Sequence, residues 1–382
     1  MMTRRERLTR TLHGLPVDRP AVCFYELNGL DENPADGDPF NIYSDPSWKP
    51  LLDLTREKTD RIVIRYVPFP DAPPDPAADL TTEERWTDSH GSRFTRTLIR
   101  AGGRTLTRLN RRDPDVRTIW TVEHLLKDED DLQAWLDLPR APFGGSPDIR
   151  RVLETERQLG DTGIVMLDTA DPIGIVAGLF DMAEYTILAM TQEKLMHRAL
   201  EKAAEFLLPK VEAIAQALPG RMWRICGPEY ASPPYLPPRL FAEYVTRYVT
   251  PMVQAIQKHG GFARVHSHGR LKDILDEIAS TGCDALDPIE PPPQGDVELS
   301  YVRERYGKQL VLFGNLEVAD IENLPADAFE EKVRQALREG TAGTGRGFVL
   351  LPSACPYGRT ITDRTLRNYE TMVRLTEQWG GN

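Results

Sequence analysis

The feature that most constrains the fold is a regular alternation of short apolar segments with amphipathic helical segments. Alternation of this kind favours a parallel sheet whose strands are covered by helices. Eight such units favour closure into a (β/α)8 TIM barrel, and a barrel with insertions can use all 382 residues, 1–382, as one domain. An open doubly wound sheet is the alternative, but the sequence has no Gly-x-Gly-x-x-Gly turn to bind a dinucleotide. The predicted strands lie near residues 21, 61, 163, 221, 262, 284, 309 and 347.

Two segments depart from this alternation. Residues 3–13 predict a short basic amphipathic helix before the first strand. Residues 93–100 and 104–109 alternate polar and apolar side chains on either side of Gly102-Gly103, which predicts a β-hairpin with one solvent-exposed face. We therefore expect an N-terminal helical extension and an antiparallel β-hairpin insertion at about 68–122, which serves as a lid or an interface.

The bulk composition restricts the functional classes. The formal net charge of -11 argues against a nucleic-acid-binding surface. The N-terminus lacks the apolar stretch of a signal peptide, and no run approaches the roughly 18 apolar residues of a membrane-spanning helix. We expect a cytoplasmic protein with no nucleic-acid or membrane partner, and a homodimer is a candidate assembly. The cysteines form no Cys-x-x-Cys pair and are typical of a reduced protein: Cys23, Cys226, Cys283 and Cys355.

Two histidines end the fifth predicted strand. His266 and His268 are two residues apart, so their side chains leave the strand on the same face. Converging neutral imidazoles are typical metal ligands, and Cys355, which also follows an apolar run, is a candidate third ligand. Two imidazoles and one thiolate suit zinc and leave a fourth position open. The alternatives are that the histidines only cap the strand with hydrogen bonds and that Cys355 is a buried thiol.

Polar side chains gather at the carboxyl ends of the predicted strands, where barrels carry their chemistry. Asn28, Tyr66 and Asn315 are candidates to bind substrate, although Asn315 would serve equally well to hold a loop. Asp171 precedes a proline and is better explained as a helix cap. The candidates for a general acid or base are Glu26, Asp168, Glu229 and Glu290.

Several motifs together resemble the uroporphyrinogen decarboxylase superfamily, whose fold is a (β/α)8 barrel. The resemblance covers the ends and the second half of the chain well and the insertion poorly. It is carried by residues 4–20, the His-x-His-Gly segment 266–269, Gly282-Cys283-Asp284-Ala285-Leu286, Phe313-Gly314-Asn315-Leu316 and Gly347-Phe348-Val349-Leu350.

The superfamily contains two chemistries. Uroporphyrinogen decarboxylases use arginines and an aspartate around a tetrapyrrole, without a metal, and carry an arginine-bearing segment after the first strand. Residues 25–29 here contain no arginine, which argues against porphyrinogen decarboxylation. The cobalamin-dependent methyltransferases, such as the methylcobamide:coenzyme M type and related O-demethylase components, bind zinc through His-x-Cys and a distant Cys. The corresponding residues are His266, His268 and Cys355, and an imidazole in place of the middle thiolate would leave zinc more Lewis acidic.

This resemblance implies a zinc-dependent methyltransferase that moves a methyl group between a small molecule, such as a methyl ether, and a corrinoid (cobalamin). Zinc is expected on His266, His268 and Cys355, and one of the candidate acids would polarise the leaving oxygen. The corrinoid is expected on a separate protein, because the chain has no Asp-x-His-x-x-Gly cobalamin motif. The alternatives are a metal-independent lyase of the decarboxylase type that acts on a small carboxylic acid, and a non-catalytic ligand-binding barrel.

Overall fold

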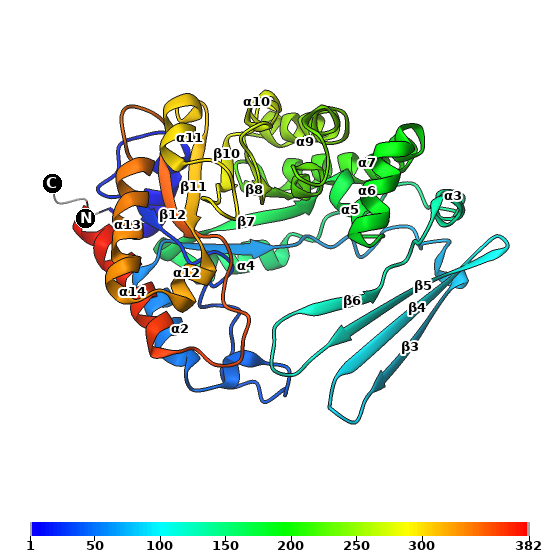
Figure 1. Cartoon of the computed structure of the whole chain (residues 1–382), viewed down its shortest axis with the longest axis horizontal. Coiled ribbons are helices and arrows are strands. Elements are labelled where there is room, and N and C mark those ends of the chain that lie inside the picture. The colour runs from blue at the N-terminus through cyan, green and yellow to red at the C-terminus, as the bar shows by residue number, and fades with distance from the viewer. Residues whose placement is uncertain (1, 380–382) are drawn as a thin grey trace.

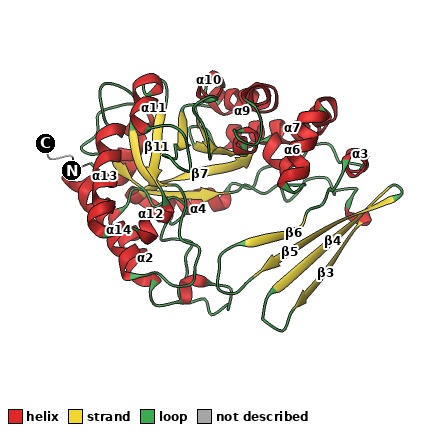
Figure 2. Cartoon of the chain, in the orientation of Figure 1, coloured by secondary structure: helices red, strands yellow, loops and turns green. Residues whose placement is uncertain are grey.

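The computed structural model describes residues 2–379. Its centre is a sheet of eight parallel strands that is surrounded by helices (Figures 1 and 2). The strands follow one another in the order β1-β12-β11-β10-β9-β8-β7-β2, so each lies beside its neighbours in the chain. They are β1 (Ala21–Val22), β2 (Arg61–Arg65), β7 (Gly163–Ala170), β8 (Met222–Cys226), β9 (Phe262–Ser267), β10 (Ala285–Pro288), β11 (Val311–Leu316) and β12 (Phe348–Pro352).

The two ends of this strand order meet through the residue before β2. The backbone N–H of Asp60 donates to the carbonyl of Val22 at 2.8 Å, and the N–H of Val22 donates to Oδ2 of Asp60 at 2.9 Å. The buried Asp60 carboxylate also pairs with Arg7 at 2.5 Å and with Arg19 at 2.9 Å. Arg7 belongs to α1 (Arg4–Leu12), so these charge-assisted bonds hold the N-terminal helix at the closing point. The predicted (β/α)8 barrel is confirmed.

Amphipathic helices cover the outside of the strands (Figure 2). In α7, for example, Leu200, Ala204, Leu207 and Val211 recur at helical spacing and are all buried. Within residues 2–379, no helix is both long and apolar enough to cross a membrane. The helices after α1 are α2 (Trp48–Lys58), α3 (Glu129–Leu136), α4 (Arg150–Leu159), α5 (Pro172–Ala177), α6 (Met182–Thr191), α7 (Glu193–Ala217), α8 (Pro238–Phe241), α9 (Arg247–Lys258), α10 (Leu275–Ser280), α11 (Leu299–Tyr306), α12 (Val318–Asn323), α13 (Ala326–Gly340) and α14 (Asp363–Trp379).

Alternation along each strand divides the core into an outer layer and a barrel interior. In β8, Trp223 and Ile225 pack outward into the large cluster shared with the helices, whereas Met222 belongs to the smaller interior cluster. Leu8 and Leu12 of α1 close that interior cluster at one end. Toward the carboxyl ends of the strands the same interior-facing positions hold polar side chains, which places the candidate site.

The insertion is a second, antiparallel sheet that lies across from the barrel (Figure 1). The predicted hairpin is present as β4 and β5, and β3 and β6 extend it on either side. The N–H of Arg117 donates to the carbonyl of Tyr357 at 2.8 Å, and the N–H of Arg359 donates to the carbonyl of Asp115 at 3.0 Å. The insertion is thereby bound to the loop that follows β12. Its strands are β3 (Thr81–Thr87), β4 (Arg93–Ala101), β5 (Arg104–Arg112) and β6 (Ile119–Glu123).

Candidate active site

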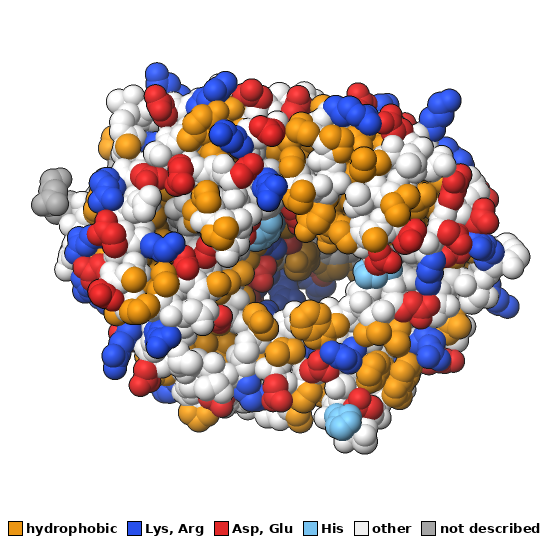
Figure 3. Space-filling model, in the orientation of Figure 1, with side chains coloured by type: hydrophobic (Ala, Val, Ile, Leu, Met, Phe, Trp, Pro, Cys, Tyr) orange, Lys and Arg blue, Asp and Glu red, His pale blue; other side chains and the backbone are white. Residues whose placement is uncertain are grey.

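The parallel register aligns polar residues at the carboxyl ends of four neighbouring strands. Asp168 of β7 lies beside Arg224 of β8, and Cys226 of β8 lies beside His266 of β9. His266 in turn lies beside Asp287 of β10. Residues in register on neighbouring strands point to the same face, so these side chains meet in the barrel mouth. Figure 3 shows a hollow between the barrel and the insertion, with basic side chains deep inside it and acidic and histidine side chains around it.

The two predicted histidines lie together, and each is held by a carboxylate. Their ring centroids are 4.6 Å apart, with an interplanar angle of 86°. Nδ1 of His266 lies 2.8 Å from Oδ2 of Asp287, and Nδ1 of His268 lies 2.8 Å from Oε1 of Glu290. Glu290 also accepts the backbone N–H of Gly269 at 2.7 Å, which fixes the turn after β9. A carboxylate at Nδ1 sets the tautomer of the ring and leaves Nε2 for a substrate or a metal.

Tyr25 brings a phenol to the remaining nitrogen of His266. Its Oη lies 3.3 Å from Nε2 of His266 and accepts a hydrogen bond from Arg224 at 2.7 Å. The backbone of Tyr25 has a φ of 51°, a left-handed conformation that non-glycine residues rarely adopt and that tends to persist at functional sites. Burial raises the pKa of Tyr25 well above its ordinary value, so the phenol stays protonated and can donate to Nε2.

Arg224 is a buried cation at the centre of the mouth. It donates to both carboxylate oxygens of Asp168, at 2.7 and 3.1 Å, and to Oε1 of Glu26 at 3.2 Å. The exposed Tyr66 donates to Oδ2 of Asp168 at 2.7 Å. Burial would raise the pKa of Asp168, but the hydrogen bonds and charge of Arg224 lower it below its ordinary value. Asp168 is therefore an ionised partner that positions Arg224.

The carboxylates that hold the histidines are also ionised. Burial would raise the pKa of Asp287, but the charge of Arg264 and the hydrogen bond with His266 lower it to about 2. Arg264 lies 3.0 Å from Oδ1 of Asp287 as an ion pair that lacks hydrogen-bond geometry. Burial likewise opposes the shift at Glu290, whose pKa is lowered by its hydrogen bond to His268. That bond raises the pKa of His268 although burial acts in the opposite direction.

Glu317, which follows β11, has a raised pKa, in contrast to Asp287 and Glu290. Ser353 donates to its Oε2 at 3.0 Å, whereas its buried Oε1 has no hydrogen-bond partner among residues 2–379. Burial, together with the negative charge of Glu290, raises the pKa of Glu317 to about 7. A carboxyl group that titrates near neutral pH is suited to donate and accept protons at that pH.

Most of the other predicted residues make local contacts. Asn28 is buried in its own turn, where its Oδ1 accepts the N–H of residue 30 at 2.9 Å and its Nδ2 donates to the carboxylate of residue 31 at 2.9 Å. Glu229 accepts the N–H of Gly227 at 3.1 Å. Asp171 caps α5 and accepts an N–H there at 2.7 Å, as expected for a helix cap. Asn315 lies at the carboxyl end of β11 and is half-buried.

Cys355 does not join the histidines in a ligand group. It lies half-buried on the loop after β12. Burial raises the pKa of its thiol to about 12, and the charge of Glu26 acts in the same direction. Across residues 2–379, no group of three or more His, Cys, Asp or Glu side chains has an arrangement that could hold a metal ion. His266 and His268, anchored by carboxylates, fit two positions of a zinc site, but the third predicted ligand is not assembled with them.

Sequence reasoning does not single out Tyr25, Arg224 or Glu317. A signal for Arg224 is nevertheless present, because it occupies the interior-facing position between Met222 and Cys226 in an otherwise apolar strand. Tyr25 lies two residues after Cys23, so the alternation of the strand also predicts that both side chains face the barrel interior. Glu317 follows a predicted strand, which places it at the barrel mouth, but its raised pKa depends on burial and on Glu290, which the sequence pattern does not reveal.

A comparison with protein-family models places this chain. Residues 151–379 match the model described as "Uroporphyrinogen decarboxylase (URO-D)", which is more than half of the 382 residues. The chain belongs to the uroporphyrinogen decarboxylase family. The predicted resemblance is confirmed at this level, and the matched region of this URO-D family member contains both histidines. Members of the superfamily are enzymes, either decarboxylases or related methyltransferases, and the match does not separate these two branches.

Other comparisons add little to this assignment. No curated protein matches the URO-D family chain. Among solved structures, D-psicose 3-epimerase in the presence of D-fructose is similar with a TM-score of 0.33 and 8% sequence identity, over 62% of this chain and 94% of that chain. The order of the eight parallel strands, and not this likeness, identifies the barrel.

Proposed function

We propose that this URO-D family member is a zinc-dependent methyltransferase. It moves a methyl group between a small-molecule donor, such as a methyl ether, and a corrinoid carried on a separate protein. The observation that supports this proposal most is the pair His266 and His268, because each imidazole is held at Nδ1 by a carboxylate, which directs Nε2 to a ligand. Zinc-binding histidines usually have such a carboxylate or carbonyl partner on the other ring nitrogen.

The charge of the mouth also supports methyl transfer over porphyrinogen decarboxylation. Arg224 and Arg264 are already paired with buried carboxylates. Glu26, Glu229 and Glu290 add further negative charge around them. A substrate with many carboxylates would be repelled there, whereas a divalent cation would be attracted.

The residues that would hold zinc are His266 and His268, through Nε2, and on His266 zinc would take the place of the Tyr25 hydroxyl. Zinc, when bound, supplies Lewis acidity that weakens the bond between the methyl carbon and the leaving oxygen. Cys355 remains the third ligand that the family resemblance predicts. To serve in that role, its thiol would have to lose its proton and approach the histidines, so zinc affinity should increase with pH.

Glu317 is the residue best suited to protonate the leaving oxygen. Its pKa of about 7 leaves a substantial protonated fraction at neutral pH, and its Oε1 is not engaged by the protein among residues 2–379. Asp168 and Glu290 are also predicted acids, but Arg224 lowers the pKa of Asp168 and the hydrogen bond with His268 lowers the pKa of Glu290, so both carboxylates favour the ionised form. A reduced corrinoid on the partner protein, when bound, would supply the electron pair for the new bond to the methyl carbon. The electron pair of the broken carbon–oxygen bond stays on oxygen, which takes the proton from Glu317.

The corrinoid protein would have to present its cofactor at the open end of the barrel, because the histidines lie there. The hollow between the barrel mouth and the insertion is the proposed docking surface (Figure 3). The insertion is attached to the loop that carries Cys355, through the Arg117–Tyr357 and Asp115–Arg359 hydrogen bonds. A corrinoid protein that docks at the insertion would therefore affect the position of the loop after β12, which also carries the candidate zinc ligand Cys355.

A metal-independent lyase of the decarboxylase type is the second candidate. It is favoured by the contact of Tyr25 with His266, because a phenol, an imidazole and the Asp287 carboxylate form a continuous proton path without a metal. In that reaction the bond to a carboxylate carbon breaks, carbon dioxide leaves, and the remaining carbon takes a proton from His266 or Tyr25. Arg224 would orient the substrate through the Tyr25 hydroxyl.

The two candidates are separated by a spectroscopic assay. Cob(I)alamin is mixed with the protein and a series of aryl methyl ethers, and the absorbance change to methylcob(III)alamin is followed. Methyl transfer is supported if at least one ether is demethylated by wild type and not by His268→Ala. If no ether methylates the corrinoid while small carboxylic acids release carbon dioxide in a His266-dependent manner, the lyase is correct and the methyltransferase proposal fails.

A further inference from the structure

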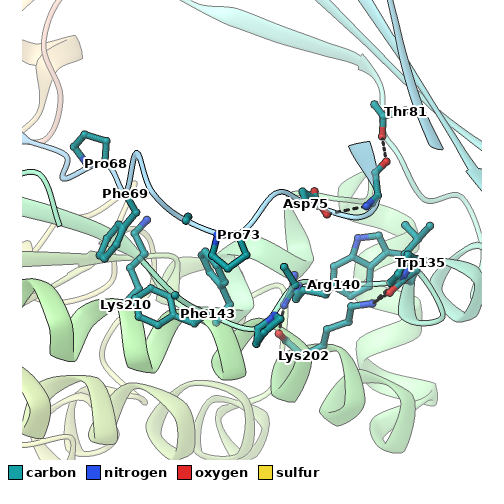
Figure 4. Close-up of a pocket in the computed structure, with 18 of the residues that line it drawn as sticks. Pro68, Phe69, Pro73, Asp75, Thr81, Trp135, Arg140, Phe143, Lys202 and Lys210 are labelled. Carbon is teal, nitrogen blue, oxygen red and sulfur yellow. Dashed lines mark hydrogen bonds between the residues drawn. The ribbon is translucent and has the colours of Figure 1, made fainter. Parts of the chain in front are cut away.

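A second cavity lies outside the barrel, where the insertion joins it (Figure 4). Its volume is about 540 Å3, within the range of small-molecule sites. Three parts of the chain line it: the segment that leads from β2 to β3, the segment 138–144 between α3 and α4, and one face of α7. Thr81 and Ile99 of the insertion sheet complete the wall.

Aromatic side chains form the walls of this cavity. Phe69 and Phe143 have ring centroids 5.2 Å apart in an edge-to-face arrangement, and Phe143 and Phe206 are 5.8 Å apart in the same arrangement. Trp135 is almost fully buried beside them. The walls would accept a flat apolar group, since edge-to-face aromatic contacts favour a further ring.

Three cationic side chains also face the cavity. Lys202 donates to the carbonyls of Trp135, Leu136 and Leu138 at 3.0, 2.7 and 2.9 Å. Arg140 donates to the carbonyl of Lys202. Both therefore stabilise the wall through backbone oxygens, and burial lowers the pKa of each.

Lys210 differs from these two, because its ammonium group forms no hydrogen bond or ion pair within residues 2–379. It is half-buried, and burial lowers its pKa. In Figure 4 its side chain extends beside Phe69, toward the open space of the cavity. An unpaired ammonium group in a partly apolar cavity has lost hydration without gaining a partner, and an anion would restore that partner.

The charge of the cavity contrasts with that of the whole protein. Among the described residues, no carboxylate lies within 4.0 Å of Lys202, Lys210 or Arg140, and Asp75 is the acidic residue in the lining. The lining is therefore net positive, whereas the whole chain carries a formal charge of -11. A positive, aromatic-walled cavity on an acidic protein selects anions that also carry an apolar body.

We propose that this cavity is a binding site for a small aromatic carboxylate, with its ring against the wall formed by Phe69, Phe143 and Phe206 and its carboxylate on Lys210. The site is separate from the barrel mouth and does not depend on the proposed methyl transfer. Because its wall combines a barrel helix with the insertion sheet, a bound carboxylate bridges the two. The insertion thus has a ligand-binding role in addition to its contact with the loop after β12.

Calorimetric titration with 2-naphthoate tests this proposal, with 2-naphthamide as the neutral ligand of the same shape. We expect wild type to bind 2-naphthoate, Lys210→Met to weaken binding at least about tenfold, and Lys210→Arg to retain most of it. Lys194→Met is the matched control, because Lys194 is exposed on the same helix and lies outside the cavity. It should bind like wild type. 2-Naphthamide should bind more weakly than 2-naphthoate to wild type, and it should bind equally to wild type and to the Lys210 and Lys194 variants.

The titration also locates the site. Phe143→Ala should weaken both ligands, because it removes the aromatic wall, whereas His266→Ala should weaken neither. The proposal is overturned if 2-naphthoate fails to bind wild type at millimolar concentration, or if Lys210→Met and Lys194→Met bind it equally. Loss of binding in His266→Ala alone would also overturn it, since the ligand would then occupy the barrel mouth.

Discussion

Nδ1 of His266 lies 2.8 Å from Oδ2 of Asp287, the fully buried carboxylate at the corresponding position of the neighbouring strand. The register of β9 and β10 therefore brings His266 and Asp287 together, and their contact does not depend on the loops. Asp287 also carries the ion pair with Arg264, which is itself almost fully buried. One carboxylate thus orients the candidate catalytic imidazole and neutralises a buried guanidinium group.

Asp287→Asn is expected to destabilise the protein by about 3–5 kcal/mol, because it leaves the buried Arg264 charge without a counter-charge. The free energy of unfolding, measured by urea denaturation, checks this value. Glu377→Gln is the control, since Glu377 pairs with Lys58 at 3.4 Å on the exposed surface and should cost less than about 1 kcal/mol. Equal losses in the two variants would contradict the role assigned to Asp287.

Arg224 and Asp168 should show strong coupling in a double-mutant cycle. Arg224→Met alone leaves the Asp168 carboxylate buried and unpaired, and Asp168→Asn alone leaves the guanidinium group without its bidentate partner. Each single variant is expected to lose about 3–5 kcal/mol of stability. The double variant should lose clearly less than the sum, since it removes both charges. Additive losses would show that the two side chains do not depend on each other.

The raised pKa of Glu317 predicts a pH dependence of stability with a definite sign. Its pKa is about 7 in the folded protein against an ordinary value of 4.5, so the folded state binds the proton more tightly than the unfolded chain. This contribution to stability is complete below pH 4.5 and is lost as the pH rises through about 7. Melting temperatures measured across this window should fall less with pH in Glu317→Gln than in wild type. If the melting temperatures of wild type and Glu317→Gln change with pH in parallel, the pKa of Glu317 is close to its ordinary value and the prediction is wrong.

The sequence pattern predicts the barrel well because it depends on local properties. Strand spacing and helical periodicity locate the eight strands, and the two-residue spacing of His266 and His268 predicts that they share a face. The same alternation could have placed Arg224 inside the barrel. The alternation locates the two histidines. It does not reveal that Asp287 and Glu290 are their carboxylate partners, because these residues belong to the next strand and the loop after it.

Other properties of the site depend on distant contacts and could not be predicted. The position of Cys355 is set by a loop that is bound to the insertion, so no spacing relates it to the histidines. Strand β3 also has no clear signal, because its residues are largely exposed and are ordered by pairing with β4. Its alternation is masked by the charged run Glu83-Glu84-Arg85.

Tyr25→Phe distinguishes the two candidate reactions without a metal measurement. It removes the hydroxyl that contacts His266 and Arg224 and keeps the ring. A lyase that uses the phenol as its proton source should lose roughly 100-fold or more in kcat, with little change in KM. A methyltransferase that protonates through Glu317 should lose less than about tenfold. Circular dichroism of both proteins provides the folding control.

Zinc content is the measurement that tests the central claim most directly. Wild type, His266→Ala, His268→Ala and Cys355→Ala are purified without added chelator, and zinc is quantified per chain by mass spectrometry. The account predicts about one zinc ion per wild-type chain, with strong loss in each histidine variant and reduced content in Cys355→Ala. Equally low zinc in wild type and all three variants, even after incubation with zinc and removal of the excess, would contradict a metal site at these residues.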